Sequence, residues 1–181
     1  MARTPKLIAL SILIAFGGSP QTPTKPWPQE PTGFKSVPFG SSRKEARSIL
    51  HFKMGDCPRF ENTLCTLKID AVGFTLTAYL KFSDKQFVEA VGTFPSENYS
   101  DVRDMFVSMY GPPQDTKESE VQNGLGATFK QEILHWNGSR AFVMLGRYGS
   151  TVTGGMFAVG LASVRDAEVA AREAAKKNVL K

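Results

Sequence analysis

The residues best suited to chemistry are few, because the 181-residue chain holds only two cysteines and two histidines. Cys57 and Cys65 are eight positions apart. In an exported protein an isolated cysteine pair at short range is most simply a disulfide, so we expect Cys57 to bond to Cys65. The alternative, a metal site that adds His51 and Asp56 to the two thiols, matches no zinc spacing. We therefore expect no metal and no cofactor.

The two histidines do not by themselves indicate catalysis. His51 follows a short predicted helix, and His135 stands in a predicted strand just before Trp136. A general base needs a nucleophile or a carboxylate within reach, and no motif places one beside either histidine. Neither a Gly-x-Ser-x-Gly elbow nor a phosphate-binding loop with its lysine occurs. The sequence predicts no catalytic residue and a protein that is not an enzyme.

Three aromatic residues remain as candidates for recognition. Trp136, Phe142 and Tyr148 belong to the second predicted hairpin and the turn after it. They form a possible binding surface for a ligand or a peptide. The alternative is that they are ordinary core residues, as aromatic side chains in a small sheet usually are.

The N-terminal segment 1–17 has the features of a secretory signal peptide. Arg3 and Lys6 precede an apolar run over 7–16, and Gly17 offers a small residue for cleavage. The run is shorter than the roughly 20 residues that a membrane-spanning helix needs. No cysteine follows it closely, so we expect no lipid anchor. We expect a periplasmic or secreted protein with no membrane span once the signal is cleaved.

The remaining chain divides into three parts. Residues 18–33 contain five prolines and predict an extended linker, in which Trp27 is expected to dock on the domain. Residues 34–163 predict one compact domain. Residues 164–181 predict a charged, alanine-rich helix whose small side chains gain little from burial, so it is held weakly or awaits a partner.

Hydrophobic periodicity places the first elements of the domain. Ser42 and Glu45 form a capping box that opens a short helix. Apolar and polar residues alternate over 74–82, which predicts a strand, and 87–94 returns as its hairpin partner.

The second half of the domain follows the same plan. A helical apolar stripe begins at Tyr99 and ends before Gly111, and the polar residues 114–126 predict a loop. Asn-Gly at 137–138 separates two β-rich runs, which predicts a second hairpin, and 151–162 predicts a fifth strand. The element order predicts an α+β fold: an antiparallel sheet of about five strands with two helices on one face, plus a C-terminal helix.

Composition and charge exclude several classes of protein. Hydrophobic residues make up 41% of the chain, which excludes disorder over most of its length. The net charge is +5, but the basic residues are dispersed among acidic ones. A basic surface for nucleic acid requires a cluster of Lys and Arg, so we expect no nucleic-acid partner.

Three segments carry a resemblance to known proteins: 33–42, 80–87 and 109–113. In this order they resemble small exported bacterial proteins of unknown function with a helix–hairpin repeat. More distantly, the chain is similar to outer-membrane assembly lipoproteins, whose lipidated cysteine it lacks, and to the β-lactamase-inhibitor protein. The resemblance implies an α+β scaffold that binds other proteins and does not catalyse a reaction.

We therefore expect a non-enzymatic binding module of the bacterial cell envelope, whose partner is an envelope or extracellular protein. The alternative is a carrier of a small ligand or lipid in a cleft between helix and sheet. The two differ in whether Phe106, Met109, Trp136 and Phe142 fill the core or leave a cavity. The sequence leaves the partner's identity and the oligomeric state open.

Overall fold

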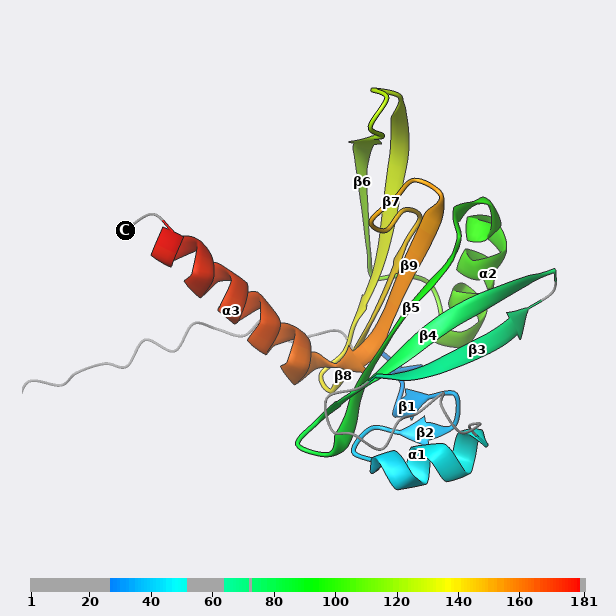
Figure 1. Ribbon diagram of the computed structural model, residues 1–181, viewed down its shortest axis with the longest axis vertical. Helices are drawn as coiled ribbons and strands as arrows, with labels where there is room; N and C mark the ends of the chain where they lie inside the picture. Colours follow the sequence, from blue (N-terminus) through cyan, green and yellow to red (C-terminus); the bar gives the residue numbers. More distant parts are fainter. Residues whose placement is uncertain (1–26, 52–63, 72, 180–181) are drawn as a thin grey trace, which may run out of the picture.

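The computed structural model describes residues 27–51, 64–71 and 73–179, without the side chains of the last two residues. The predicted signal peptide 1–17, the linker residues 18–26 and Cys57 lie outside the described residues. Figure 1 shows the described chain as one large twisted sheet with helices on both sides.

Seven antiparallel strands form the large sheet, in the order β3-β4-β5-β9-β8-β7-β6. They are β3 (Cys65–Ala71), β4 (Phe74–Ser83), β5 (Gln86–Pro95), β6 (Asp115–Gln122), β7 (Thr128–Asn137), β8 (Ala141–Gly146) and β9 (Gly154–Leu161). A separate two-stranded sheet pairs β1 (Gly33–Phe34) with β2 (Val37–Pro38). The predicted sheet of about five strands is therefore wrong.

The two strands that the prediction missed are the two edges of the large sheet. β6 lies in the segment predicted as a polar loop, and nearly all of its side chains are exposed. It pairs with β7 over its whole length, so main-chain pairing holds it rather than an apolar face. β3 does alternate, with Cys65, Leu67 and Ile69 turned toward the core side of the sheet, and that signal was available in the sequence.

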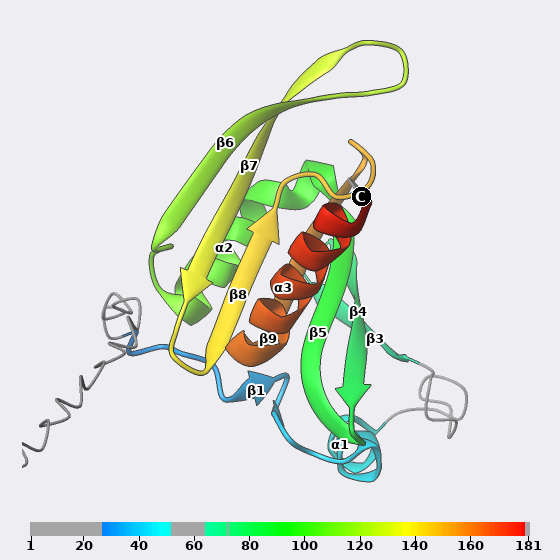
Figure 2. The same cartoon turned by 90° about the vertical axis from the view of Figure 1, so that its left-hand side faces the viewer.

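The prediction of two helices on one face is also wrong. Helix α2 (Tyr99–Tyr110) lies across one face, and α3 (Ala162–Val179) lies on the opposite side, as Figure 2 shows. Helix α1 (Arg43–Leu50) stands at the end of the sheet beside β2 and β5. We call the surface under α2 the packed face and the surface on the α3 side the open face.

The local signals behind these elements are confirmed. The Ser42 side chain accepts from the Glu45 amide while the Glu45 carboxylate accepts from the Ser42 amide, which is the predicted capping box. β4 and β5 form the predicted hairpin through Asp84 and Lys85, which both have positive φ, as a tight two-residue turn requires. Helix α2 ends at Gly111, whose φ is 77°.

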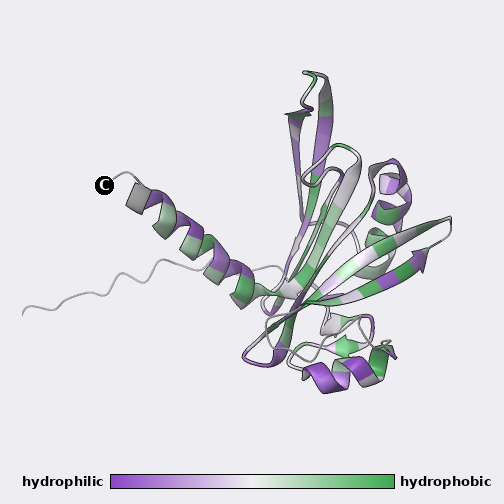
Figure 3. Cartoon of the chain, in the orientation of Figure 1, coloured by the Kyte–Doolittle hydropathy of each residue, from purple (hydrophilic) through white to green (hydrophobic). Residues whose placement is uncertain are grey.

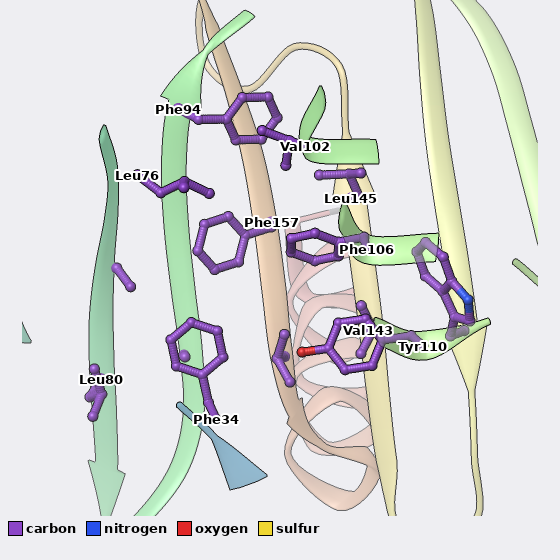
Figure 4. Close-up of a cluster of buried hydrophobic side chains, with 14 of the residues drawn as sticks. Phe34, Leu76, Leu80, Phe94, Val102, Phe106, Tyr110, Val143, Leu145 and Phe157 are labelled. Carbon is purple, nitrogen blue, oxygen red and sulfur yellow. The ribbon is translucent and has the colours of Figure 1, made fainter. Parts of the chain in front are cut away.

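The core lies between α2 and the packed face (Figure 4). The Phe106 ring contacts the ring of Phe157 from β9, with centroids 5.5 Å apart, and the ring of Trp136 from β7, at 6.5 Å. Phe94 and Phe157 each cross to a glycine on the neighbouring strand, Gly155 and Gly92. These aromatic rings take the space that a side chain on the glycines would fill.

The described part of the predicted linker, residues 27–33, is attached to the domain. Trp27 Nε1 donates to the carbonyl oxygen of Tyr110 at 2.8 Å, which confirms that Trp27 docks. Glu30 Oε1 accepts from the backbone amides of Arg140 and Ala141 at 2.6 and 2.8 Å. The segment thereby joins the end of α2 to the connection between β7 and β8.

Candidate functional site

The three aromatic residues predicted to form a surface lie in three different places. Trp136 is fully buried on the packed face, where its Nε1 donates to the carbonyl oxygen of Gly111 at 2.9 Å. Phe142 is 6% exposed and lies on the open face. Tyr148 follows β8, with its ring 5.9 Å from that of Phe129. The fold therefore does not bring the three together.

The cysteine prediction stays a prediction. Cys65 is the first residue of β3 and is fully buried, next to the guanidinium of Arg43. Its expected partner, Cys57, lies outside the described residues. A buried position on a strand facing the core is compatible with a structural cysteine and unsuited to a reactive one.

The two histidines differ in their exposure and in their surroundings. His51 is exposed and ends α1 in the left-handed conformation, with φ of 50°. His135 lies on β7, and burial together with the nearby Lys117 lowers its pKa. The strand partners of His135 are Asp115 on β6 and Met144 on β8, so its neighbours in the sheet include a carboxylate but no hydroxyl nucleophile.

A polar cleft opens where the first turn of α2 meets β7 and the end of β8. Its volume is about 430 Å³, and Tyr99, Arg103, Glu132 and Arg147 line its centre. The Tyr99 hydroxyl donates to Glu132 Oε2 at 2.6 Å, and Arg103 Nε lies 3.9 Å from the same oxygen. The Arg147 guanidinium lies over the Tyr99 ring, 5.6 Å from its centroid.

This cleft suits binding better than catalysis. Burial and the bond to Glu132 raise the pKa of Tyr99, so its hydroxyl keeps its proton at neutral pH and is no base. The Glu132 carboxylate is already satisfied by Tyr99 and Arg103. Two of the four charged side chains that line the cleft, Arg103 and Glu132, are thus engaged with each other.

A second hollow, between α2 and the packed face, is apolar and small. Its volume is about 80 Å³, and Ile69, Leu76, Met105 and Met109 are among its lining residues. Pockets for drug-sized ligands measure about 300–1,000 Å³. Four residues were expected to distinguish a filled core from a ligand cavity. Of these, Phe106, Trp136 and Phe142 are buried, and Met109 is 47% exposed.

The open face carries three rows of side chains that cross the strands. The first row is Lys81, Glu89, Gly160, Phe142 and Asn137; the second is Tyr79, Val91, Ala158, Met144 and His135; the third is Thr77, Thr93, Met156, Gly146 and Ile133. The second row is apolar between Tyr79 and His135, and the third row is apolar from Met156 to Ile133 with two threonines at its other end. The larger apolar side chains of these rows are partly exposed. An apolar patch with a polar rim is typical of an interaction surface.

Helix α3 covers only the first row. Arg165 donates to the side chain of Asn137 and lies over the Phe142 ring, 5.5 Å from its centroid. Lys81 pairs with Glu168 of α3 and with Glu89 of β5, and burial raises the pKa of Glu89. These contacts fix the first two turns of α3 to one end of the open face.

Beyond these turns α3 leaves the sheet. The described side chains from Val169 to Lys177 are all exposed, and Val169 is 54% exposed. Figure 1 shows the helix rising away from the strands, and Figure 3 shows hydrophilic and hydrophobic residues alternating along it. Val91, Met144 and Met156 therefore lie beyond the contacts of this helix, and their side chains are partly exposed.

The signal for a second sheet face was present in the sequence. In β5, β8 and β9 the buried residues do not alternate but run on consecutively, as in Ala141–Val143 of β8. A continuous apolar run indicates a strand with both faces withdrawn from water. It does not tell which neighbour covers the second face, and here α3 covers only part of it.

Two further observations limit the chemistry of the described residues. Within the ranges 27–51, 64–71 and 73–179, no three acidic, histidine or cysteine side chains gather closely enough to hold a metal ion. None of the helices described there has the length and the apolar character that crossing a membrane demands. No protein-family model, no curated protein and no solved structure matches this chain.

Proposed function

We propose that this protein is an exported, non-enzymatic binding module of the bacterial cell envelope, and that its open face binds another protein. The observation that carries the proposal is the partial cover of this face. Helix α3 is fixed over the row that contains Phe142 and leaves the rows of Val91 and Met156 uncovered. Export rests on the signal-peptide features of 1–17.

The chemistry of the face defines the kind of partner. Its centre is formed by Val91, Met144, Met156 and Ile133, and Ala158 lies among them. Methionine side chains are flexible and polarisable, so they adapt to irregular apolar shapes. Threonines and His135 flank the centre and supply hydrogen-bonding groups at the rim. We propose a protein segment with apolar side chains along one side, from an envelope or extracellular protein.

The carrier alternative has less support. The apolar hollow beside α2 has a volume of about 80 Å³, well below that of a lipid pocket, and Phe106 and Trp136 fill the core around it. The polar cleft at Tyr99 is larger, but its carboxylate and one of its two arginines are engaged with each other.

Photo-crosslinking in cells tests the proposal. A photoreactive phenylalanine analogue at Met144 stands in the centre of the open face, and the same analogue at Glu118, an exposed residue of β6 on the packed-face side, is the control. We expect one dominant protein adduct from position 144 and none from position 118.

A second crosslinking experiment introduces a charged residue into the open face. Val91→Glu in the chain that carries the probe at 144 is expected to abolish the adduct, while circular dichroism shows an unchanged fold. Equal adducts from positions 144 and 118, or no adduct from either, would contradict the proposal. Native mass spectrometry that finds a co-purifying small molecule would instead favour the carrier.

A further inference from the structure

The two edges of the large sheet differ in how they are protected. Edge strand β6 carries four charged residues on eight positions: Asp115, Lys117, Glu118 and Glu120. They fall on both faces, since Asp115 and Lys117 share a face with His135 and Glu118 shares one with Glu132. Charges on both faces of an edge strand oppose pairing with another strand.

Edge strand β3 lacks this protection. Its residues Leu67, Ile69 and Ala71 turn toward the packed face, and its only two charges, Lys68 and Asp70, lie on the open face. Ile69 is partly buried and lines the small apolar hollow with Met109 of α2. An edge with apolar residues on one face and few charges on the other can accept a further strand.

The charges of β3 are complementary to themselves. In an antiparallel pair of identical strands related by a two-fold axis, residue i lies opposite residue j, and j lies opposite i. When the axis passes beside Ile69, Lys68 of each copy faces Asp70 of the other. An axis at Lys68 or at Asp70 would place two like charges face to face, which is unfavourable. Charge complementarity therefore selects one register.

We propose that the chain forms a two-fold dimer in which β3 pairs with β3 of a second copy, centred on Ile69. The pairing joins the two seven-stranded sheets into one through β3, the strand at which each sheet ends within the described residues. It places Leu67 of one copy opposite Ala71 of the other on the packed face, and Ile69 opposite Ile69. Because the axis is perpendicular to the sheet, both α2 helices lie on the same side, with Met109 of each near the junction.

A charge-exchange experiment tests both the edge and the register. Lys68→Asp leaves two acidic residues on β3, and Asp70→Lys leaves two basic ones. In a dimer of either single variant, the residues at positions 68 and 70 of the two copies carry like charges and lie opposite each other twice. We therefore expect the dissociation constant measured by sedimentation equilibrium to rise at least about tenfold. The double variant Lys68→Asp/Asp70→Lys restores opposite charges and is expected to dimerise as the original chain does.

Mixing the two single variants gives the sharpest outcome. The acidic β3 and the basic β3 complement each other, so native mass spectrometry of the mixture should show the heterodimer while each variant alone stays monomeric. Lys117→Asp on β6 makes the same charge change on the other edge and should leave dimerisation unchanged. Thr75→Val removes the hydrogen bond from Thr75 to Asp70 without a charge change and should also have no effect.

Three results would overturn the proposal. The first is an original chain that stays monomeric up to about 500 µM, a concentration that would reveal even a weak dimer. The second is a loss of dimer in Lys117→Asp equal to that in Lys68→Asp, which would place the interface elsewhere. The third is a mixture of the two single variants that forms no heterodimer although thermal unfolding shows both to be folded, which would exclude this register.

Discussion

The Tyr99 hydroxyl donates a 2.6 Å hydrogen bond to Glu132 Oε2 and thereby ties the first turn of α2 to the middle of β7. Tyr99 is otherwise buried against the core, and Arg103 Nε lies 3.9 Å from the same Glu132 oxygen. The bond fixes the start of the helix that covers the packed face. It also engages the Glu132 carboxylate of the polar cleft, which is one reason why the open face is the better candidate for binding.

Replacement of Tyr99 by Phe removes this bond and keeps the ring. We expect the free energy of unfolding to fall by about 1–2 kcal/mol, since the acceptor is charged but partly exposed to water. Urea unfolding measures the change. Tyr148→Phe keeps the ring contact with Phe129 and should change stability by less than about 0.5 kcal/mol. Equal losses in the two variants would mean that the hydroxyl of Tyr99 does not hold the helix.

Two tyrosines are expected to make the protein sensitive to alkali. Burial raises the pKa of Tyr110 to about 12, and burial with the bond to Glu132 raises that of Tyr99 further. A tyrosine in the unfolded chain ionises near pH 10. The stability that these groups contribute is therefore complete below about pH 10 and is lost as the pH rises through the folded values.

Ultraviolet absorbance of the phenolate measures this titration. We expect Tyr110 to ionise only near pH 12 or on unfolding. Tyr110→Phe should make the loss of stability between these values shallower. Ionisation of all four tyrosines near pH 10 in the folded protein would contradict the burial of both residues.

Glu30 is expected to stabilise the connection between β7 and β8. Its carboxylate accepts from the amides of Arg140 and Ala141, and its side chain is 12% exposed. Glu30→Ala should cost about 1–2 kcal/mol, because the exposed amide of Arg140 and the partly buried amide of Ala141 both lose a charged acceptor. Glu30→Gln keeps an acceptor oxygen and should cost less. Glu118→Ala on the exposed edge is the matched control, and a loss there as large as in Glu30→Ala would refute the assigned role.

The glycine at 155 is expected to be essential for packing. A Cβ on Gly155 would lie 2.3 Å from the ring of Phe94, so Gly155→Ala forces that ring out of its place. We expect a loss of about 2 kcal/mol or more in thermal or urea unfolding. Gly124→Ala introduces the same methyl group where nothing lies within 4 Å and should be nearly neutral. A neutral Gly155→Ala would show that Phe94 does not pack as described.

The elements that the sequence predicted correctly are those whose signals are local. The capping box at Ser42 and Glu45, the hairpin around Asp84 and the stop of α2 at Gly111 each depend on residues a few positions apart. Such signals act on backbone dihedrals and on the first hydrogen bonds of an element. They hold wherever the element is later placed in the fold.

β3 alternates and could have been predicted, but the other features that were missed depend on distant partners. β6 has no apolar face, and only its register with β7 makes it a strand. The residue type of Trp136 does not tell whether it lies in the core or on a surface. Its ring contact with Phe106 of α2 places it in the core. Glu30 acts on Arg140 from more than a hundred positions away. No periodicity within a short window reports such pairings.

The sequence by itself determined the hairpin strands, the capping box of α1, the end of α2 at Gly111 and the charged tail helix, because hydrophobic period and turn chemistry are local properties. Only the tertiary structure decided which strands form the edges, which face α2 covers and how far α3 lies over the other. Strand order and helix placement follow from the total burial of the assembled chain. For this reason the open face and the self-complementary edge at Lys68 and Asp70 become visible only in the folded protein.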